Sequence, residues 1–264
     1  MPGLDPGPLT GAGSRTYLVG EGRPILVDTG SGVAAYADRL AEALGEEAGP
    51  PALVLVTHHH ADHQGGLAQV AALAPGTPMW KRPHPKDRVP PARALAGGEV
   101  IEADGVRLEA LFTPGHASDH LCFYWREARA LFTGDLILGG SPTIIPVDDG
   151  DLAQYLDSLE RLLALDLEVL YPGHGDPITE PHAYIRGYIA HRKMREGQTL
   201  DALRAGLHTA AAIAARVYPP LGPGLRRAAR DQIFSILLKL EKEGVVIRHP
   251  AEPTEPGEPV FRLA

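Results

Sequence analysis

The chain has one cysteine in 264 residues, and no apolar run approaches the length that spans a membrane. The single thiol, Cys122, excludes an internal disulfide, and its position in the apolar run 121–125 predicts a buried core residue rather than a reactive one. The first residues carry neither a basic segment nor a hydrophobic stretch, so we expect no secretory signal. These absences argue against a disulfide scaffold and a membrane protein, and they make a cytoplasmic globular protein the default.

Imidazole and carboxylate groups are concentrated between Thr57 and His63, where the chain reads Thr-His-His-His-Ala-Asp-His. Such groups are the ligands that zinc and similar metals take when thiolates are absent, and a short loop can aim several of them at one point. The apolar run 52–56 before them predicts a buried strand, and a helical pattern follows Gly65 and Gly66. A ligand loop between a strand and a helix favours a functional site over a surface feature.

A glycine directly precedes each of three further candidate ligands, His116, Asp135 and His174. Each candidate also follows or ends an apolar run that suits a strand. Glycine lets the backbone turn tightly, or approach another group without a clash at Cβ. The repetition predicts that these three residues join the first cluster in one site.

The order of these residues resembles the metallo-β-lactamase superfamily of hydrolases: His58, His60, Asp62, His63, His116, Asp135 and His174. The resemblance implies two divalent metal ions. His58, His60 and His116 would bind one ion, Asp62, His63 and His174 would bind the second, and Asp135 would bridge them. A bridging hydroxide would be the nucleophile, because two ions roughly 3.5–4 Å apart lower the pKa of a shared water toward neutrality. Zinc is the first choice, and manganese or iron would tolerate the same ligands.

Four nearby residues are given other roles. Asp62 is also the candidate catalytic residue, because its carboxylate could accept the proton of the water. His59 alternates out of the ligand pattern and is expected to pack beside the site. His120 stands where glyoxalase-like relatives have a second histidine, and we expect it to orient a ligand by hydrogen bonding. Asp28 resembles the family's early strand-end aspartate that supports the ligand loop, although an ordinary turn aspartate fits the sequence equally well.

The apolar runs fall into two similar successions, which suits a sandwich of two related halves. The expected elements are strands at 16–19 and 24–27, a helix at 32–44, the ligand strand at 52–56, strands at 106–112, 121–125 and 130–133, a helix at 151–163 and a strand at 168–171. Two sheets face to face, with helices over both outer surfaces, would bury these strands. We therefore expect an α+β fold in which residues 1–190 form a four-layer αβ/βα sandwich of metallo-β-lactamase type.

Residues 191–264 are expected to form a small winged-helix-like domain. Helices are predicted at 184–203, 209–217 and 224–243, followed by strand-like pieces at 245–248 and 259–262 that flank a loop rich in proline and glutamate. A threonine cap would begin the second helix. The succession of three helices and a hairpin is the outline of a winged helix.

Basic residues are unevenly distributed. Residues 192–250 carry eleven Lys and Arg against five Asp and Glu, a net charge of +6 in a chain whose total is −8. Arg226, Arg227 and Arg230, at the start of the third helix, could contact a phosphate backbone, but a solvated helix face is the simpler explanation. A second basic group in a proline-rich loop is expected at the rim of the cleft or on solubilising surface: Lys81, Arg82, Lys86, Arg88 and Arg93.

Further motifs narrow the resemblance to the β-lactamase-like endoribonuclease branch, which also ends in a winged-helix-like domain. They lie at 114–120, 132–139, 171–175, 191–196 and 237–244. This resemblance implies cleavage of phosphodiester bonds in single-stranded RNA. The metal motif is less specific for the substrate, since related enzymes also cut thioesters, lactams and lactones.

Three alternatives stay open. A glyoxalase II-like thioesterase, which acts on a small-molecule ester or thioester, shares the metal ligands but would carry a different helical domain. A true β-lactamase fits less well, because the zinc-type enzymes usually have cysteine where Asp135 stands. A non-catalytic nucleic-acid-binding metal sensor is the third possibility. The sequence does not indicate an oligomeric state.

Overall fold

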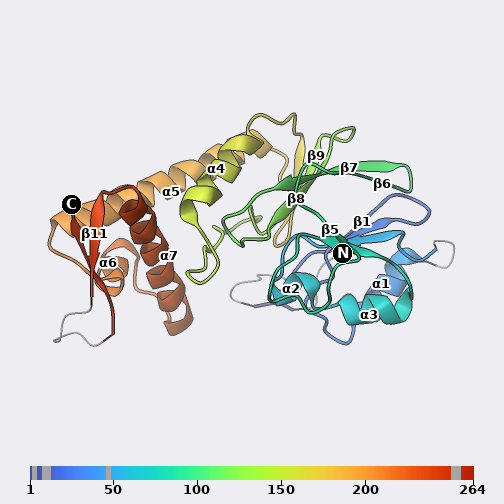
Figure 1. Cartoon of the computed structure of the whole chain (residues 1–264), viewed down its shortest axis with the longest axis horizontal. Helices are drawn as coiled ribbons and strands as arrows, with labels where there is room; N and C mark the ends of the chain where they lie inside the picture. The colour runs from blue at the N-terminus through green and yellow to red at the C-terminus, as the bar shows by residue number, and fades with distance from the viewer. Residues whose placement is uncertain (2–4, 8–12, 46–48, 251–256) are drawn as a thin grey trace.

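Two five-stranded sheets form the centre of the larger part of the molecule (Figure 1). The computed structural model describes residues 1, 5–7, 13–45, 49–250 and 257–264. The first sheet has the order β1 (Tyr17–Val19), β2 (Ile25–Val27), β3 (Leu53–Leu55), β4 (Met79–Lys81) and β5 (Arg93–Ala94), antiparallel between β1 and β2 and parallel thereafter. The second has the order β10 (Val169–Pro172), β9 (Ala130–Gly134), β8 (Leu121–Trp125), β7 (Val106–Phe112) and β6 (Val100–Ala103), parallel only between β10 and β9.

The inner faces of the two sheets share one hydrophobic core. Leu55 of β3 belongs to the same buried cluster as Phe123 of β8 and Phe132 of β9. Side chains alternate along β8, so Phe123 faces this core whereas Cys122 joins the cluster on the opposite face. Cys122 is fully buried, as predicted, and burial raises the pKa of its thiol to about 12. The thiol is therefore a core group and stays protonated.

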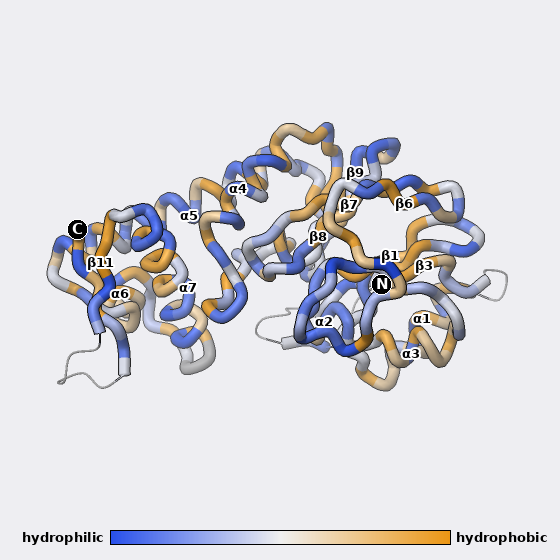
Figure 2. The backbone as a smooth tube through the Cα atoms, viewed as in Figure 1, coloured by the Kyte–Doolittle hydropathy of each residue, from blue (hydrophilic) through white to orange (hydrophobic). Residues whose placement is uncertain are grey.

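Helices cover both outer surfaces of the sandwich, which confirms the predicted four-layer fold. Helices α1 (Tyr36–Leu44) and α3 (Leu67–Leu73) pack on Leu26 and Val54 of the first sheet. Helices α4 (Leu152–Leu162) and α5 (Pro181–Arg204) pack on the outer face of the second sheet. Figure 2 shows hydrophobic residues along the strands, while the short helix α2 (Ala61–Gln64) is hydrophilic.

The C-terminal part is a winged helix, as expected. It contains α6 (Ala210–Val217), α7 (Pro223–Lys242) and an antiparallel hairpin of β11 (Val246–His249) and β12 (Val260–Leu263). Its hydrophobic residues belong to the same cluster as those between α4 and the second sheet, so this core is continuous. Helix α5 runs through the boundary expected between residues 190 and 191, and a division at that point stays a prediction. Residues 251–256 of the predicted proline- and glutamate-rich loop lie outside the described residues.

The structure corrects the interpretation of one basic group. Lys81 and Arg93 lie on β4 and β5, two short strands that the sequence did not predict; strand β6 was also missed. Lys81 is fully buried between Asp87 and Asp119, so it is not a solubilising surface residue. In the part of the chain that is described, no helix combines the length and hydrophobicity that a membrane span requires.

Candidate metal centre

The structure brings all seven predicted ligand residues together at one edge of the sandwich. They follow strand ends: the loop after β3 carries His58 and His60, and α2 carries Asp62 and His63. The other three lie in the loops after β7, β9 and β10. Their donor atoms form two groups, each with every ligand atom within 4.8 Å of the others: His58, His60 and His116 in the first, and Asp62, His63, Asp135 and His174 in the second.

The first group consists of three imidazole nitrogens that converge on one point. His60 Nδ1 lies 3.0 Å from His58 Nε2 and 3.0 Å from His116 Nε2. The remaining nitrogen of His58 lies 3.0 Å from the hydroxyl of Thr57, and that of His116 lies 2.7 Å from the carbonyl of Ile144. These outer hydrogen bonds favour tautomers in which the inward nitrogens carry lone pairs, as a metal ligand requires.

The second group combines two imidazoles with two carboxylates. His174 Nε2 lies 3.1 Å from Asp62 Oδ2 and 3.4 Å from Asp135 Oδ1. His63 Nε2 lies 3.2 Å from the same Asp135 oxygen. The other oxygen of Asp135 lies 3.6 Å from His116 Nε2, so this carboxylate faces both groups.

The buried polar atoms of the second group fit a cation. His63 Nε2 and Asp135 Oδ1 are buried and face each other at 3.2 Å, but neither atom forms a hydrogen bond of good geometry within the described residues. Such atoms are costly in a protein interior unless another group compensates them. Imidazole nitrogens and carboxylate oxygens are the donors that zinc, manganese and iron accept, so the set is chemically suited to a metal.

Electrostatics differ between the two groups. Burial and neighbouring imidazoles lower the pKa of His58 well below its usual value and that of His60 to about 3, so these rings are neutral. Burial alone would lower the pKa of His63, but the carboxylates of Asp135, Asp28 and Asp62 raise it well above its usual value. The second group is thus rich in negative charge and is stabilised by a positive charge, which a proton or a metal ion can supply.

Asp28 supports the ligand loop, which decides between the two roles that the sequence left open. Its carboxylate accepts hydrogen bonds from Thr57 N–H at 2.8 Å and from Thr57 Oγ1 at 2.9 Å. The Nδ1 atom of His63 lies 2.8 Å from the same carboxylate. One aspartate therefore orients candidate ligands of both groups, directly for His63 and through Thr57 for His58.

His120 and His59 both lie beside the ligands. His120 Nε2 accepts a hydrogen bond from the backbone N–H of Asp135 at 3.2 Å, so it orients that loop. The ring of His59 stacks on His84 at 3.7 Å, and its Nδ1 lies 2.9 Å from Asp119. With Asp149, His59 and His84 form a third group of donor atoms, but these atoms already bond to one another and to Asp119 and Ser118.

All three glycines that precede candidate ligands leave no room for a side chain, and two of them, Gly134 and Gly173, face other residues of the site. A Cβ atom on Gly173 would lie 2.6 Å from Asp135 Oδ1 and 2.7 Å from His63 Cε1. Gly134 has a φ of +46°, and a Cβ there would lie 2.7 Å from His120 Nε2. The glycines thus allow the ligand loops to approach each other closely.

Comparison with known families agrees with this architecture. The profile of the metallo-beta-lactamase superfamily matches residues 9–174, and that of the beta-lactamase associated winged helix domain matches residues 209–252. The first match covers more than half of the chain. The chain therefore belongs to the metallo-beta-lactamase superfamily of hydrolases.

Several curated proteins are similar to this chain. Thioesterase pkgB of Emericella nidulans is 40% identical over 195 residues, which are 74% of this chain and 55% of pkgB. Lactamase-like protein aptB of the same organism is 38% identical over 74% of this chain and 62% of its own length. The beta-lactamase-like protein 2 homolog of Caenorhabditis elegans is 34% identical over 92% of this chain and 84% of its own length. The chain thus spans less than two thirds of the two fungal relatives.

Solved structures extend the similarity to the whole chain. The metallo-beta-lactamase family protein TTHA1429 from Thermus thermophilus has a TM-score of 0.79 and 26% identity, covering 100% of this chain and 97% of that one. The protein TTHA1623, solved in a di-iron-bound form, has a TM-score of 0.56 and 29% identity over 69% of this chain and 96% of that one. The alignment with TTHA1429 therefore includes both the sandwich and the winged helix, and the two chains are similar in length.

Proposed function

We propose that this chain is a metal-dependent thioesterase that acts on a small-molecule thioester. The observation that carries the proposal is the pair of ligand groups that face each other across Asp135. A relative that is 40% identical is named a thioesterase, which favours thioesters over the other substrates of the superfamily. Among the alternatives that the sequence left open, this one has the most support.

All seven residues are proposed as ligands, in the two groups that the structure forms. Zinc stays the first choice, and the di-iron form of a similar protein supports iron as a second. When bound by these residues, two such ions would lower the pKa of a water molecule and would stabilise negative charge on a carbonyl oxygen. The chain's own contribution is to hold the neutral rings of the first group and the carboxylates of the second in place. Asp62 is partly exposed, with 27% of its side chain accessible, so we propose it as the group that accepts a proton from water.

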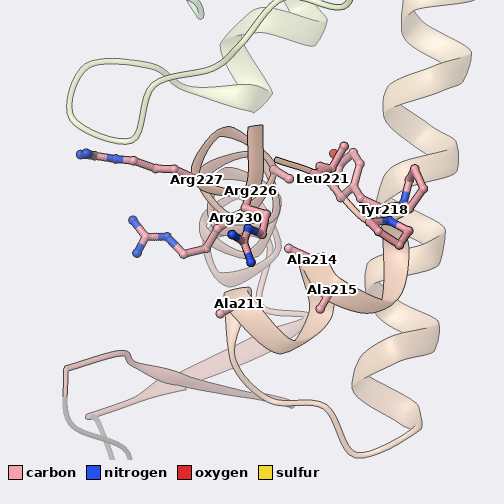
Figure 3. Close-up of a pocket in the computed structure, with 11 residues that line it drawn as sticks. Ala211, Ala214, Ala215, Tyr218, Leu221, Arg226, Arg227 and Arg230 are labelled. Atoms are coloured by element: carbon pink, nitrogen blue, oxygen red, sulfur yellow. The ribbon is translucent and has the colours of Figure 1, made fainter. Parts of the chain in front are cut away.

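Single-stranded RNA has weaker support as the substrate. Many basic residues of the C-terminal part are already paired, as Lys242 is with Asp151 at 2.6 Å and Lys239 with Glu196 at 2.8 Å. Arg226, Arg227 and Arg230 line a cavity of about 390 Å³ whose other walls include Ala211, Ala214 and Tyr218 (Figure 3). These three arginines lie within the C-terminal part, and none of them belongs to the seven residues of the candidate metal centre. RNA cleavage and a non-catalytic sensor are the two other hypotheses. Faster hydrolysis of RNA would support the first, and the absence of turnover on every substrate would support the second.

The experiment compares substrates and metal content on the purified chain. We expect about two metal ions per chain and faster hydrolysis of an acyl thioester than of single-stranded RNA or a β-lactam. His63→Ala should abolish turnover and lower the metal content, because the ring of His63 is fully buried within the second group. His249→Ala, in the exposed strand β11, is the matched control and should change neither. A chain without metal that still cuts thioesters, or one that prefers RNA, would contradict the proposal.

A further inference from the structure

Three successive carbonyl groups of loop 143–145 are each bound by a side chain. Arg192 of α5 donates to the carbonyl of Thr143. The carbonyl of Ile145 accepts from Gln232 Nε2 at 3.2 Å and from Ser235 Oγ at 3.0 Å, both on α7. Between them, the carbonyl of Ile144 lies 2.7 Å from His116 Nδ1. We call Arg192, Gln232 and Ser235 the loop clamp.

The loop clamp is one connected network, in which Arg192 and Ser235 are buried and Gln232 is half-buried. Arg192 is only 6% exposed, and its Nη1 donates to Gln232 Oε1 at 2.7 Å while its guanidinium lies 5.1 Å from the ring centre of Tyr155. Ser235 is also 6% exposed. A buried guanidinium without hydrogen-bond partners is costly, and the partners of Arg192 come from the loop and from α7. Moving the loop, α5 or α7 apart would break these bonds, which favours one arrangement of the three.

The carbonyl of Ile144 determines which nitrogen of His116, a candidate ligand, carries the proton. When His116 donates its Nδ1 proton to Ile144, Nε2 is left with a lone pair that points toward His60 Nδ1, 3.0 Å away. The carbonyl also fixes the orientation of the ring. The two flanking carbonyls are held by α5 and α7, so these helices determine where the middle one lies.

We propose that the loop clamp consists of positioning residues that tune metal binding by the first group through Ile144 and His116. This inference rests on the proposed ligand role of His116. It makes the winged-helix part a component of the metal centre rather than a separate appendage. Loss of the clamp should lower the metal affinity of the first group. The metal affinity of the second group should not change, because no clamp residue forms a hydrogen bond with Asp62, His63 or His174 in the described structure.

The test measures zinc affinity by competition with a chelator. The double variant Ser235→Ala/Gln232→Leu should bind one of its two ions about tenfold more weakly, a typical effect of changes behind the ligands. The double variant Ser235→Thr/Gln232→Leu keeps a hydroxyl at position 235. It should bind this ion more tightly than Ser235→Ala/Gln232→Leu does. Lys242→Met is the matched control, since it breaks another contact of α7 with the catalytic part, to Asp151, without touching loop 143–145.

The outcomes separate this inference from the proposed function. If His116→Ala loses one ion but the double variant binds both as tightly as the wild type, the clamp has no positioning role. If Lys242→Met weakens binding as much as the double variant does, general loosening explains the effect and the inference is wrong. If His116→Ala keeps both ions at full affinity, the ligand assignment fails, and the inference fails with it.

Discussion

At the scale of single residues, buried charges hold the ligand loop on the sheet. Asp119 bonds to His59 through one oxygen, and its other oxygen lies 3.1 Å from Lys81 Nζ. Lys81 also pairs with Asp87. Because Lys81 lies between the two carboxylates, removing one of these charges leaves its partner less well compensated in the interior. This network ties β4 to the segment that carries His58 and His60.

We expect Asp119→Asn to lower the free energy of unfolding by about 2 kcal/mol at pH 7. Burial alone would raise the pKa of Asp119, but His59 and Lys81 lower it to about 2, from the usual 3.8. A lowered folded-state pKa gives stability that is complete above about pH 4 and is lost as the pH falls toward 2. Urea unfolding at pH 7 and at pH 3 should therefore show a smaller difference between variant and wild type at the lower pH.

The control for this prediction is Asp157→Asn on α4. Asp157 forms an exposed ion pair with Arg161, and 70% of its side chain is accessible. Exposed pairs contribute little, so the variant should stay within about 0.5 kcal/mol of the wild type. If both substitutions lower the free energy of unfolding equally, the buried network contributes no more stability than an exposed ion pair.

Gly173→Ala should remove metal without unfolding the chain. The added methyl group would collide with Asp135 and His63, while the φ of Gly173 is not in the left-handed region. Metal analysis after dialysis should find fewer ions per chain, and circular dichroism should be unchanged. Gly187→Ala in α5, where a Cβ meets nothing within 4 Å, is the control and should stabilise the helix by about 0.5–1 kcal/mol. Full metal content in Gly173→Ala would mean that the ligand loops can move apart at no cost.

At the scale of elements, the sequence predicted the long strands and helices well. Strands β7 and β8 have the predicted bounds, because runs of alternating or continuous apolar residues in them are buried. Strands β4 and β5 could not be foreseen: they have three and two residues, and each carries a basic residue. Their strand geometry depends on pairing with β3 and with each other, which is a tertiary contact that leaves no local pattern.

In the candidate site, too, the sequence predicted residues that form a local pattern and missed those that depend on tertiary contacts. Its seven residues stand out in the sequence because metal ligands need particular side chains at short spacings. The loop clamp could not be found in this way, because two of its partners are backbone carbonyls, which any residue supplies. The role of Asp28 was open for a related reason: its partners Thr57 and His63 are 29 and 35 residues away.

The cap of α6 allows a quantitative test at this scale. Thr209 accepts a hydrogen bond from Ala212 N–H at 3.2 Å, as the sequence predicted. Thr209→Ala should lower the free energy of unfolding by about 1 kcal/mol, because an N–H group of the first turn loses its partner. Thr209→Ser keeps the acceptor oxygen and should lose less. Equal losses in urea unfolding would assign the effect to the methyl group of Thr209 rather than to the cap.

At the scale of the whole molecule, the two parts share one core. Tyr155 and Leu159 of α4 belong to the same buried cluster as Ile233 and Leu237 of α7. Lys242 of α7 also pairs with Asp151, the N-cap residue of α4. Separation of the parts would therefore expose apolar surface on both sides.

We expect the metal-free chain to unfold in a single transition. Trp80 and Trp125 lie in the two sheets, so their fluorescence reports on the sandwich. Far-UV circular dichroism is dominated by helices, of which α5 and α7 are the longest, with 24 and 20 residues. The two signals should give the same midpoint in urea, as a cooperative unit requires. Separate midpoints would show that the winged helix is an independent unit.

Helix α5 connects the sandwich to the winged helix without a break. Its 24 residues form a rod of about 36 Å, and it packs on both parts. A continuous helix cannot act as a hinge unless its hydrogen bonds break. The C-terminal part therefore keeps one position relative to the sandwich, because neither α5 nor the shared core provides a hinge.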